Sequence, residues 1–460
     1  MSEALKPSAV GTNLQRLTDE IGGRVPGTAA MQKAVQWGVE GFKNAGADSV
    51  HTEDFTMPAS WAEGATRMSV VAPEQFEVRL NSIAWAPALA AQHHVRVVDV
   101  GSGTPENFKQ AGDVVGSILL VHQAEMHNWA DLDAEYTRAG GIIDRALAAK
   151  ALAIAFQSTR PHDLLYRHAN SVAGEIDRLP MVIVAREDAS RMARLLASGQ
   201  ALFADLEIPN QIGGPITTSN VIAEIRGREK PEEYVVLGAH LDSWELGTGA
   251  LDNGCNAALV IDALRAIKAS GVQPRRSMRF MLFSGEEEGL LGSWAYVNAH
   301  VSEMDKIAGV AIIDTGIGRI SGFSLGGRKD LMRQTSAAVT PLKQFGEIKL
   351  MTDIESGTDH LDFLLQGVPT FVAYQDEANY LLNYHASSDT FDKVDVPELK
   401  KHVAEMAGLA FALADGAERI GPRLTRAQIE QTMRETHFDD EMKANGMWKD
   451  WANRKRGRTD

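Results

Sequence analysis

The sequence predicts an α/β fold in which a mostly parallel central sheet is flanked by helices and interrupted by an inserted domain. Three observations support this prediction. After Pro215, near-continuous apolar strands alternate with helical segments, which is typical of a parallel sheet covered on both faces. Two clusters of turn residues, at 101–107 and 208–215, enclose a region of different character. Finally, the 460 residues exceed the length of one typical domain.

The first elements of the chain are two predicted helices, over residues 12–22 and 28–46, each ending at a glycine. Thr28 is a candidate N-cap for the second helix. A strand is predicted at 51–57. Short apolar strands and helices then fill residues 99–214, which we predict to be the inserted domain.

The main domain is predicted to comprise residues 1–98 and 215–420. Its strands include EYVVLGAH, RFMLFSG, AGVAIID and VPTFVAY, whose apolar runs indicate burial on both faces. Residues 421–460 are predicted to be a C-terminal helical extension. It begins with a capping box formed by Thr425 and Gln428, and it ends in the basic string RKRGR, which we expect to be solvated.

Composition limits the possible classes of function. A formal net charge of −15 argues against nucleic-acid binding, because the polyanion would be repelled. No stretch reaches the roughly 18 apolar residues of a membrane span. The first ten residues show no secretory leader. We therefore expect a cytoplasmic protein, or a secreted or periplasmic one if a leader was removed. The single cysteine, Cys255, excludes an intrachain disulfide and a thiolate zinc cluster.

Side chains that commonly bind metals follow three successive apolar strands, and ligands bind beyond the carboxyl ends of strands in sheets of this kind. Asp252 stands at the start of a predicted helix, and His360 and His385 lie in polar segments further along the chain. We expect them to meet in one crevice. These candidates are His240, Asp242, Asp252, Glu286, Glu287, Asp314, His360 and His385.

The chemistry of this set points to a metal site. Carboxylates that converge on one crevice raise one another's pKa unless cations neutralise them. Imidazole and carboxylate groups without sulfur suit zinc, with manganese or cobalt as alternatives. The neighbouring Glu288 is expected to be a solvated surface charge.

The residues lie in motifs that resemble those of the zinc peptidases of the M28 type. In chain order the motifs are GAHLDSW, ALDNG, FSGEEEGLLGS, IIDTG, SGTDHLDF and NYHASSDT, and the resemblance covers nearly all of the chain except the last forty residues. It implies a zinc aminopeptidase-like fold with a protease-associated lid domain inserted before the metal-bearing strands. It also implies a homodimeric, zinc-dependent exopeptidase that hydrolyses small peptides, of the dipeptidase, carboxypeptidase or aminopeptidase type.

The resemblance further implies two zinc ions per chain and a role for each ligand. One ion would be held by His240 and Asp314, and the other by Glu287 and His385. Asp252 would bridge the two ions.

Two more carboxylates receive roles from the resemblance. Glu286 is expected to be the general base, and the carboxylate of Asp242 to orient His240. The chain departs from the family at Asn253, where the relative has a second acid. Because the bridging ligand is the first residue of that pair, we expect the bridge to persist.

Alternatives remain for the activity and for the insertion. Ser324 stands in the pattern G-x-S-x-G of serine hydrolases, although a glycine-rich stretch rather than a long strand precedes it. A binding protein on the same scaffold, or an acyl-transfer or cyclase variant that uses the metal site, is a further possibility; the complete ligand set argues against a protein without catalysis. The insertion is expected either to restrict substrates to short peptides or to serve dimerisation alone.

Overall fold

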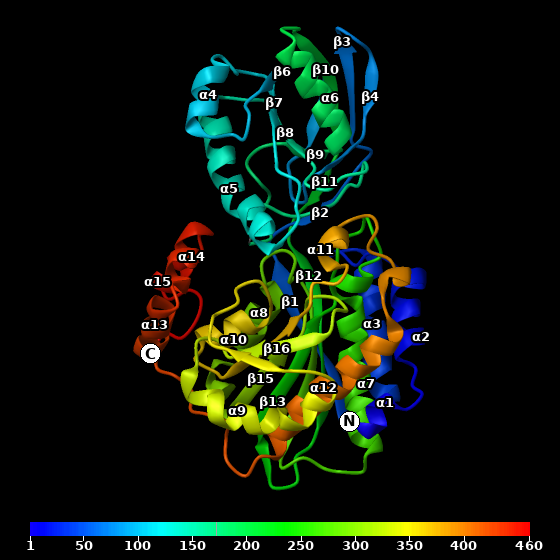
Figure 1. Ribbon diagram of the computed structural model, residues 1–460, viewed down its shortest axis with the longest axis vertical. Helices are drawn as coiled ribbons and strands as arrows, with labels where there is room; N and C mark the ends of the chain where they lie inside the picture. Colours follow the sequence, from blue (N-terminus) through cyan, green and yellow to red (C-terminus); the bar gives the residue numbers. More distant parts are fainter. Residues whose placement is uncertain (172) are drawn as a thin grey trace.

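The computed structural model describes residues 1–171 and 173–460 and contains two eight-stranded sheets stacked along the long axis of the molecule (Figure 1). The first sheet has the order β1 (Ser49–Met57), β12 (Ile216–Ile225), β14 (Arg276–Phe283), β13 (Lys230–His240), β15 (Ile307–Ile312), β18 (Thr370–Gln375), β16 (Ile320–Ser324) and β17 (Lys349–Met351).

The centre of the first sheet is parallel, as predicted. Strands β14, β13, β15 and β18 run in one direction, with His240 in register with Phe283 on the neighbouring strand. Strand β12 is antiparallel to both of its neighbours, and β16 is antiparallel to β18, so the sheet is mixed at its edges. The four parallel strands therefore bring their carboxyl ends to one edge of the sheet.

Helices cover both faces of this sheet. Successive side chains of β13 point to opposite faces of the sheet and pack into two different hydrophobic cores: Val235 and Leu237 on one face, and Val236 on the other. The first face is covered by α1 (Ser2–Leu5), α2 (Val10–Gln15), α3 (Ala29–Asn44), α7 (Cys255–Ala269) and α12 (Val396–Asp415). The second is covered by α8 (Leu291–Ala299) and α10 (His360–Leu365). Near-continuous apolar strands thus reflect burial on both faces.

Local signals in the sequence are reproduced closely. The Thr28 hydroxyl accepts a hydrogen bond from the Met31 amide and caps α3, as predicted. The helix expected at 12–22 consists of α2 and a π-helical turn, Arg16–Ile21. Cys255 is buried at the start of α7. The remaining helical elements of the main domain are η2 (Ala250–Gly254), η3 (Val301–Lys306), η4 (Lys329–Leu331), α9 (Met332–Val339), η5 (Thr340–Gln344), α11 (Tyr380–Asn383) and η6 (Phe391–Lys393).

The second sheet lies in the chain between β1 and β12, and we call residues 58–215 the second unit. Its sheet has the order β4 (Phe76–Val78), β3 (Arg67–Ala72), β10 (Leu202–Ile208), β6 (Leu89–Asp99), β7 (Ile118–Val121), β8 (Ala153–Gln157), β9 (Met181–Val184) and β5 (Leu80–Ser82). Its helices are α4 (Pro105–Ala111), α5 (Trp129–Ala148) and α6 (Arg186–Ala197), and a ribbon of β2 (Ser60–Ala62) and β11 (Gln211–Gly213) joins its two ends.

The second unit begins earlier than the residue 99 expected from the sequence. Strands β3 and β6 pair with β10, a partner more than a hundred residues further along the chain, so residues 67–99 belong to this sheet. The turn cluster at 101–107 is instead the connection into α4, which Thr104 caps. A local change in composition could not reveal a pairing between such distant segments.

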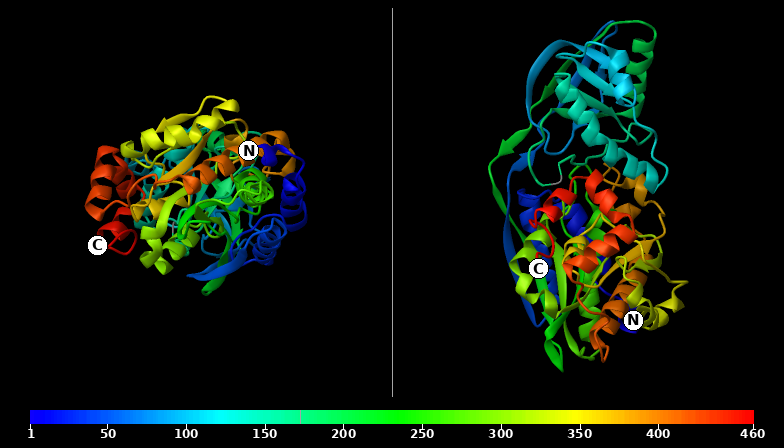
Figure 2. Two further views of the ribbon diagram at one scale, coloured as in Figure 1. Left: turned by 90° about the horizontal axis from the view of Figure 1, so that it is seen from below. Right: turned by 90° about the vertical axis from the view of Figure 1, so that its left-hand side faces the viewer.

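The C-terminal extension consists of α13 (Arg426–Glu435), α14 (Phe438–Ala444) and α15 (Trp448–Ala452), and it lies on the side of the molecule opposite the N-terminal helices (Figure 2). The predicted capping box of Thr425 and Gln428 is present. The basic tail, however, is not wholly solvated: Arg456 is 5% exposed and pairs with Asp362 on α10. In the described part of the chain, no helix has the length and apolar character needed to span a bilayer.

Candidate metal centre

The candidate ligands gather at the carboxyl edge of the parallel strands. His240 is the last residue of β13, Glu287 lies just beyond β14, and Asp314 lies just beyond β15. Asp252 belongs to η2, which precedes α7, and His385 follows α11. Chain segments far apart in the sequence therefore meet at one point because parallel strands end on the same edge.

His240 and Asp314 form one half of the cluster. The Nε2 atom of His240 lies 2.9 Å from Oδ1 of Asp314 and 3.2 Å from Oδ1 of Asp252. The Nδ1 atom of His240 donates to the backbone carbonyl of Asp242 at 3.0 Å. A neutral imidazole whose Nδ1 donates has a lone pair on Nε2. That lone pair would face two carboxylate oxygens, an arrangement that calls for a cation between them.

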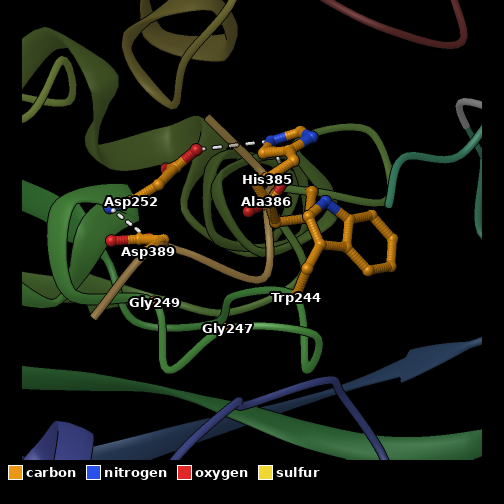
Figure 3. Close-up of a pocket in the computed structure, with 8 residues that line it drawn as sticks. Trp244, Gly247, Gly249, Asp252, His385, Ala386 and Asp389 are labelled. Carbon is orange, nitrogen blue, oxygen red and sulfur yellow. Dashed lines mark hydrogen bonds and ion pairs between the residues drawn. The ribbon is translucent and has the colours of Figure 1, made fainter. Parts of the chain in front are cut away.

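His385 and Glu287 form the other half. The Nε2 atom of His385 lies 2.9 Å from Oε2 of Glu287 and 3.3 Å from Oδ2 of Asp252. Asp252 thus presents one carboxylate oxygen to each histidine, and Figure 3 shows its contact with His385. Ligand atoms of His240, Asp252 and Glu287 lie within 4.8 Å of one another, close enough to share an ion.

The charge of the cluster fits divalent cations. Burial raises the pKa of Glu287 to about 7. Burial alone would lower the pKa of His385, but the charges of Glu287 and Asp252 outweigh it and raise that pKa to about 9. Oε1 of Glu287 and Oδ2 of Asp252 are buried, and no hydrogen-bond donor of the described residues serves them. Buried carboxylates of this kind are stable when a metal neutralises them, and imidazole with carboxylate suits zinc.

Glu286 and Asp242 adjoin the cluster in different ways. Burial raises the pKa of Glu286 well above its usual range, and the charges of Asp314 and Glu287 add to the effect. Asp242 holds His240 through its backbone carbonyl, whereas its carboxylate Oδ1 lies 3.8 Å from Nδ1 of that histidine. Its Oδ2 accepts from the amide of Glu287 at 3.2 Å. The Asp242 carboxylate therefore orders the loop that carries Glu286 and Glu287.

Asp389 supports the bridging position, and reasoning from the sequence did not single it out. Its carboxylate accepts from the amides of Leu251 at 2.7 Å and Asp252 at 3.1 Å (Figure 3). Burial raises its pKa to about 7. Its position in the same NYHASSDT motif as His385 was the available signal. It also lines, with Trp244 and Gly247, the pocket drawn in Figure 3.

Arg24 is a second supporting residue that the sequence did not reveal. Its fully buried guanidinium donates to the backbone carbonyls of Leu241 at 2.6 Å, Thr248 at 2.7 Å and Gly249 at 2.8 Å. Burial lowers its pKa to about 10. The arginine ties together the two ends of the loop between His240 and Asp252, and no local pattern marks it.

Two side chains near the cluster, Glu288 and His360, differ from expectation, and a third, Asp359, was not among the candidates. Glu288 is not a solvated charge: it is 1% exposed, and in residues 1–171 and 173–460 neither of its carboxylate oxygens has a hydrogen-bond donor. The loop after β14 turns it inward beside Asp242, which helps to raise its pKa. His360 donates from Nε2 to the carbonyl of Glu355 at 2.9 Å and stays outside the ligand group. Asp359 is buried beside it, also without a donor.

The structure gives Asn253 and Ser324 roles in holding the backbone. The amide of Asn253 donates to the carbonyl of Ile313 at 3.2 Å and accepts from Asn256 at 2.6 Å, so both ends of this side-chain amide are engaged. The buried hydroxyl of Ser324 donates to the carbonyl of Asp353 at 2.7 Å. A hydroxyl engaged in this way does not favour the serine hydrolase alternative.

Known proteins have sequences related to this chain. Residues 220–410 match the sequence model of Peptidase family M28. Carboxypeptidase Q of Mus musculus is 25% identical over 408 residues, which span 88% of this chain and 85% of that protein. Carboxypeptidase Q of Homo sapiens is 24% identical over 414 residues, with the same two shares.

Solved structures are similar to this chain as well. A peptidase M28 precursor from Shewanella amazonensis SB2B superposes with a TM-score of 0.82 at 27% identity, covering 92% of this chain and 97% of that one. BSAP, a zinc aminopeptidase from Bacillus subtilis, shares the fold with a TM-score of 0.68 at 20% identity, covering 90% of this chain and 98% of that one. The fold and the resemblance predicted from the six motifs are confirmed: residues 220–410 of this chain match peptidase family M28, and the chain shares the fold of a peptidase M28 precursor.

Proposed function

We propose that this chain is a zinc-dependent exopeptidase that binds two zinc ions and hydrolyses small peptides. The observation that carries the proposal is the position of Asp252, whose two carboxylate oxygens face two separate histidine and carboxylate pairs. His240 with Asp314 would hold one ion, and His385 with Glu287 the other. The match of residues 220–410 to Peptidase family M28 and the relatives named carboxypeptidase Q and zinc aminopeptidase support this assignment.

The chain's own residues supply the proton chemistry. Zinc bound in this cluster would act as a Lewis acid on the scissile carbonyl and would lower the pKa of water to about 7. Glu286 is adjacent in the chain to Glu287, and among the described residues no hydrogen bond ties its carboxylate to His240 or His385. We assign to it the role of general base, which takes a proton from the attacking water and delivers it to the leaving amine. By accepting from the Glu287 amide, the Asp242 carboxylate would hold this loop so that Glu287 binds the metal and Glu286 acts as the base.

The second unit is proposed to limit substrates to short peptides. Figure 1 shows it above the strand ends that carry the ligands, and its residues Leu165 and Arg167 hydrogen-bond to the loop that contains His385. A folded protein would have to displace these contacts to bring a peptide bond to the cluster. Homodimerisation, which the resemblance implies, is a further part of the proposal and would be measured by sedimentation.

The metal assignment is tested by zinc stoichiometry. Metal analysis of the dialysed wild-type protein should give two zinc ions per chain, and His385→Asn should give one. His437→Asn is the matched control, because His437 is an exposed histidine of the C-terminal extension. Chelation should abolish hydrolysis and zinc should restore it, whereas a serine-directed phosphonate should have no effect. Activity that persists after measured removal of the metal would refute the assignment.

The exopeptidase assignment is tested with a panel of dipeptides and tripeptides, each with free ends, a blocked amino end or a blocked carboxyl end. Blocking one of the two ends should abolish hydrolysis, and the sensitive end identifies the enzyme as an aminopeptidase or a carboxypeptidase. Equal cleavage of peptides blocked at both ends would contradict an exopeptidase.

A further inference from the structure

Residues 160–168 of the second unit, which we call the strap, contact the loop of the metal centre that carries His385. Tyr166 of the strap forms an antiparallel bridge with Ala386, the residue after the ligand His385. The amide of Arg167 donates to the carbonyl of His385 at 2.9 Å, and the amide of Ser387 donates to the carbonyl of Leu165 at 3.0 Å. The strap therefore binds the backbone on both sides of Ala386.

A buried arginine extends this contact to the residue before the ligand. Arg160 donates from Nη2 to the carbonyl of Tyr384 at 3.1 Å. Its charge is balanced within the second unit by Glu135, 3.7 Å away, and the guanidinium lies 4.3 Å from the ring centroid of Tyr166. The side chains of Arg160 and Glu135 are both almost fully buried. Because Glu135 and Tyr166 of the second unit hold the buried guanidinium, Arg160 is a rigid anchor for the peptide group of Tyr384.

The loop that the strap holds needs such support. His385 has a φ of +58°, in the left-handed region that is uncommon for residues other than glycine. Its imidazole stacks on Tyr384, with ring centroids 3.7 Å apart. The Tyr384 hydroxyl in turn meets the hydroxyl of Tyr136 on α5 at 3.2 Å. The backbone of His385 is thus held by the strap, and its ring stacks on a tyrosine whose hydroxyl meets α5 of the second unit.

The other half of the cluster does not depend on the strap in this way. His240 is the final residue of β13, at the centre of the first sheet, and Asp314 follows the neighbouring β15. These two ligands are held by strands of the main domain. A disturbed strap should therefore affect the two halves unequally.

We propose that the strap is a positioning element of the metal centre, so that retention of zinc at His385, Glu287 and Asp252 requires the second unit. The proposal rests on the two-ion assignment above. Arg160 is its central positioning residue: it acts on the metal through the peptide group of Tyr384 and through the conformation of His385. The insertion would then be a structural part of the site in addition to any effect on substrate size.

The test removes the anchor without leaving a buried charge unpaired. The double variant Glu135→Gln/Arg160→Met should bind one zinc ion at least tenfold more weakly and the other within threefold of wild type, by competition with a graded chelator. Arg178→Met is the matched control, because Arg178 is an exposed arginine of the same unit paired with Asp144. Arg160→Lys should restore part of the affinity. Two unchanged zinc affinities in the double variant would overturn the proposal.

A second measurement uses the wild-type chain and needs no variant to fold. In the metal-free protein, the amides of Arg167 and Ser387 should exchange with deuterium at least a hundredfold more slowly than open-chain amides. Exchange at open-chain rates would mean that the strap does not hold the loop and would overturn the proposal. Failure of the two-ion assignment is seen separately, since the wild-type protein would then bind fewer than two zinc ions whatever its exchange rates.

Discussion

Removal of the Arg456 side chain from the C-terminal tail should destabilise the protein strongly. The guanidinium donates from Nε to Oδ1 of Asp362 and from Nη2 to Oδ2, both at 2.7 Å, and the side chains are 6% and 1% exposed. Breaking a buried pair of this geometry costs about 3–5 kcal/mol, because one charge is left buried without a partner. In Arg456→Met, the Asp362 carboxylate would retain the Ser293 hydroxyl at 3.3 Å. We expect a loss near the lower end of that range.

The double variant Arg456→Met/Asp362→Asn separates the pair from the packing around it. Without either charge, the desolvation penalty disappears, and we expect a loss of about 1 kcal/mol relative to wild type. The coupling free energy between the two positions should therefore reach about 2 kcal/mol or more. Arg454→Met is the matched control: Arg454 is an exposed arginine of the same tail, and its substitution should change stability by less than about 0.5 kcal/mol.

The assay is urea denaturation of wild type, the two single variants, the double variant and the control, followed by tryptophan fluorescence. Trp294 lies 4.8 Å from the Arg456 guanidinium and reports on this region directly. If Arg456→Met and Arg454→Met lose the same small amount of stability, the tail arginine is solvated in solution and the reasoning is refuted.

Three other substitutions test the site and the second unit. Glu286→Gln should lower kcat by a factor of about 10² or more with zinc content unchanged, because the amide cannot take the proton. If the variant loses zinc instead, Glu286 is the metal ligand and Glu287 the base. Asp389→Asn should cost about 1–3 kcal/mol and weaken zinc binding, since its amide group would face a backbone N–H; unaltered zinc affinity would contradict this. The Asp99 hydrogen bond raises the pKa of His122 above 6.5; burial would raise the pKa of Asp99, but hydrogen bonds from His122 and Gly101 lower it below 3.8. The stability difference between wild type and His122→Gln should thus be largest between pH 3.8 and pH 6.5. It should fade as pH rises through the folded pKa of His122 or falls through the folded pKa of Asp99. A melting-temperature difference that does not vary with pH would count against this prediction.

The sequence by itself determined the local and periodic features of this protein. Apolar runs ending in His240, Glu287 and Asp314 identified three parallel strands and the residues at their ends, because a strand buried on both faces has a continuous apolar pattern. The caps at Thr28 and Thr425 were readable because a cap is satisfied within a few residues.

Tertiary structure decided the features that depend on contacts between distant segments. The second unit starts before residue 99 because β3 and β6 pair with β10, far along the chain. Glu288 is buried and Arg456 is paired because the loop after β14, α10 and the tail converge. The strap holds His385 across more than two hundred residues of sequence. Composition and spacing describe what a side chain can bind, but only the folded chain determines which partner comes within hydrogen-bonding distance and whether water is excluded there.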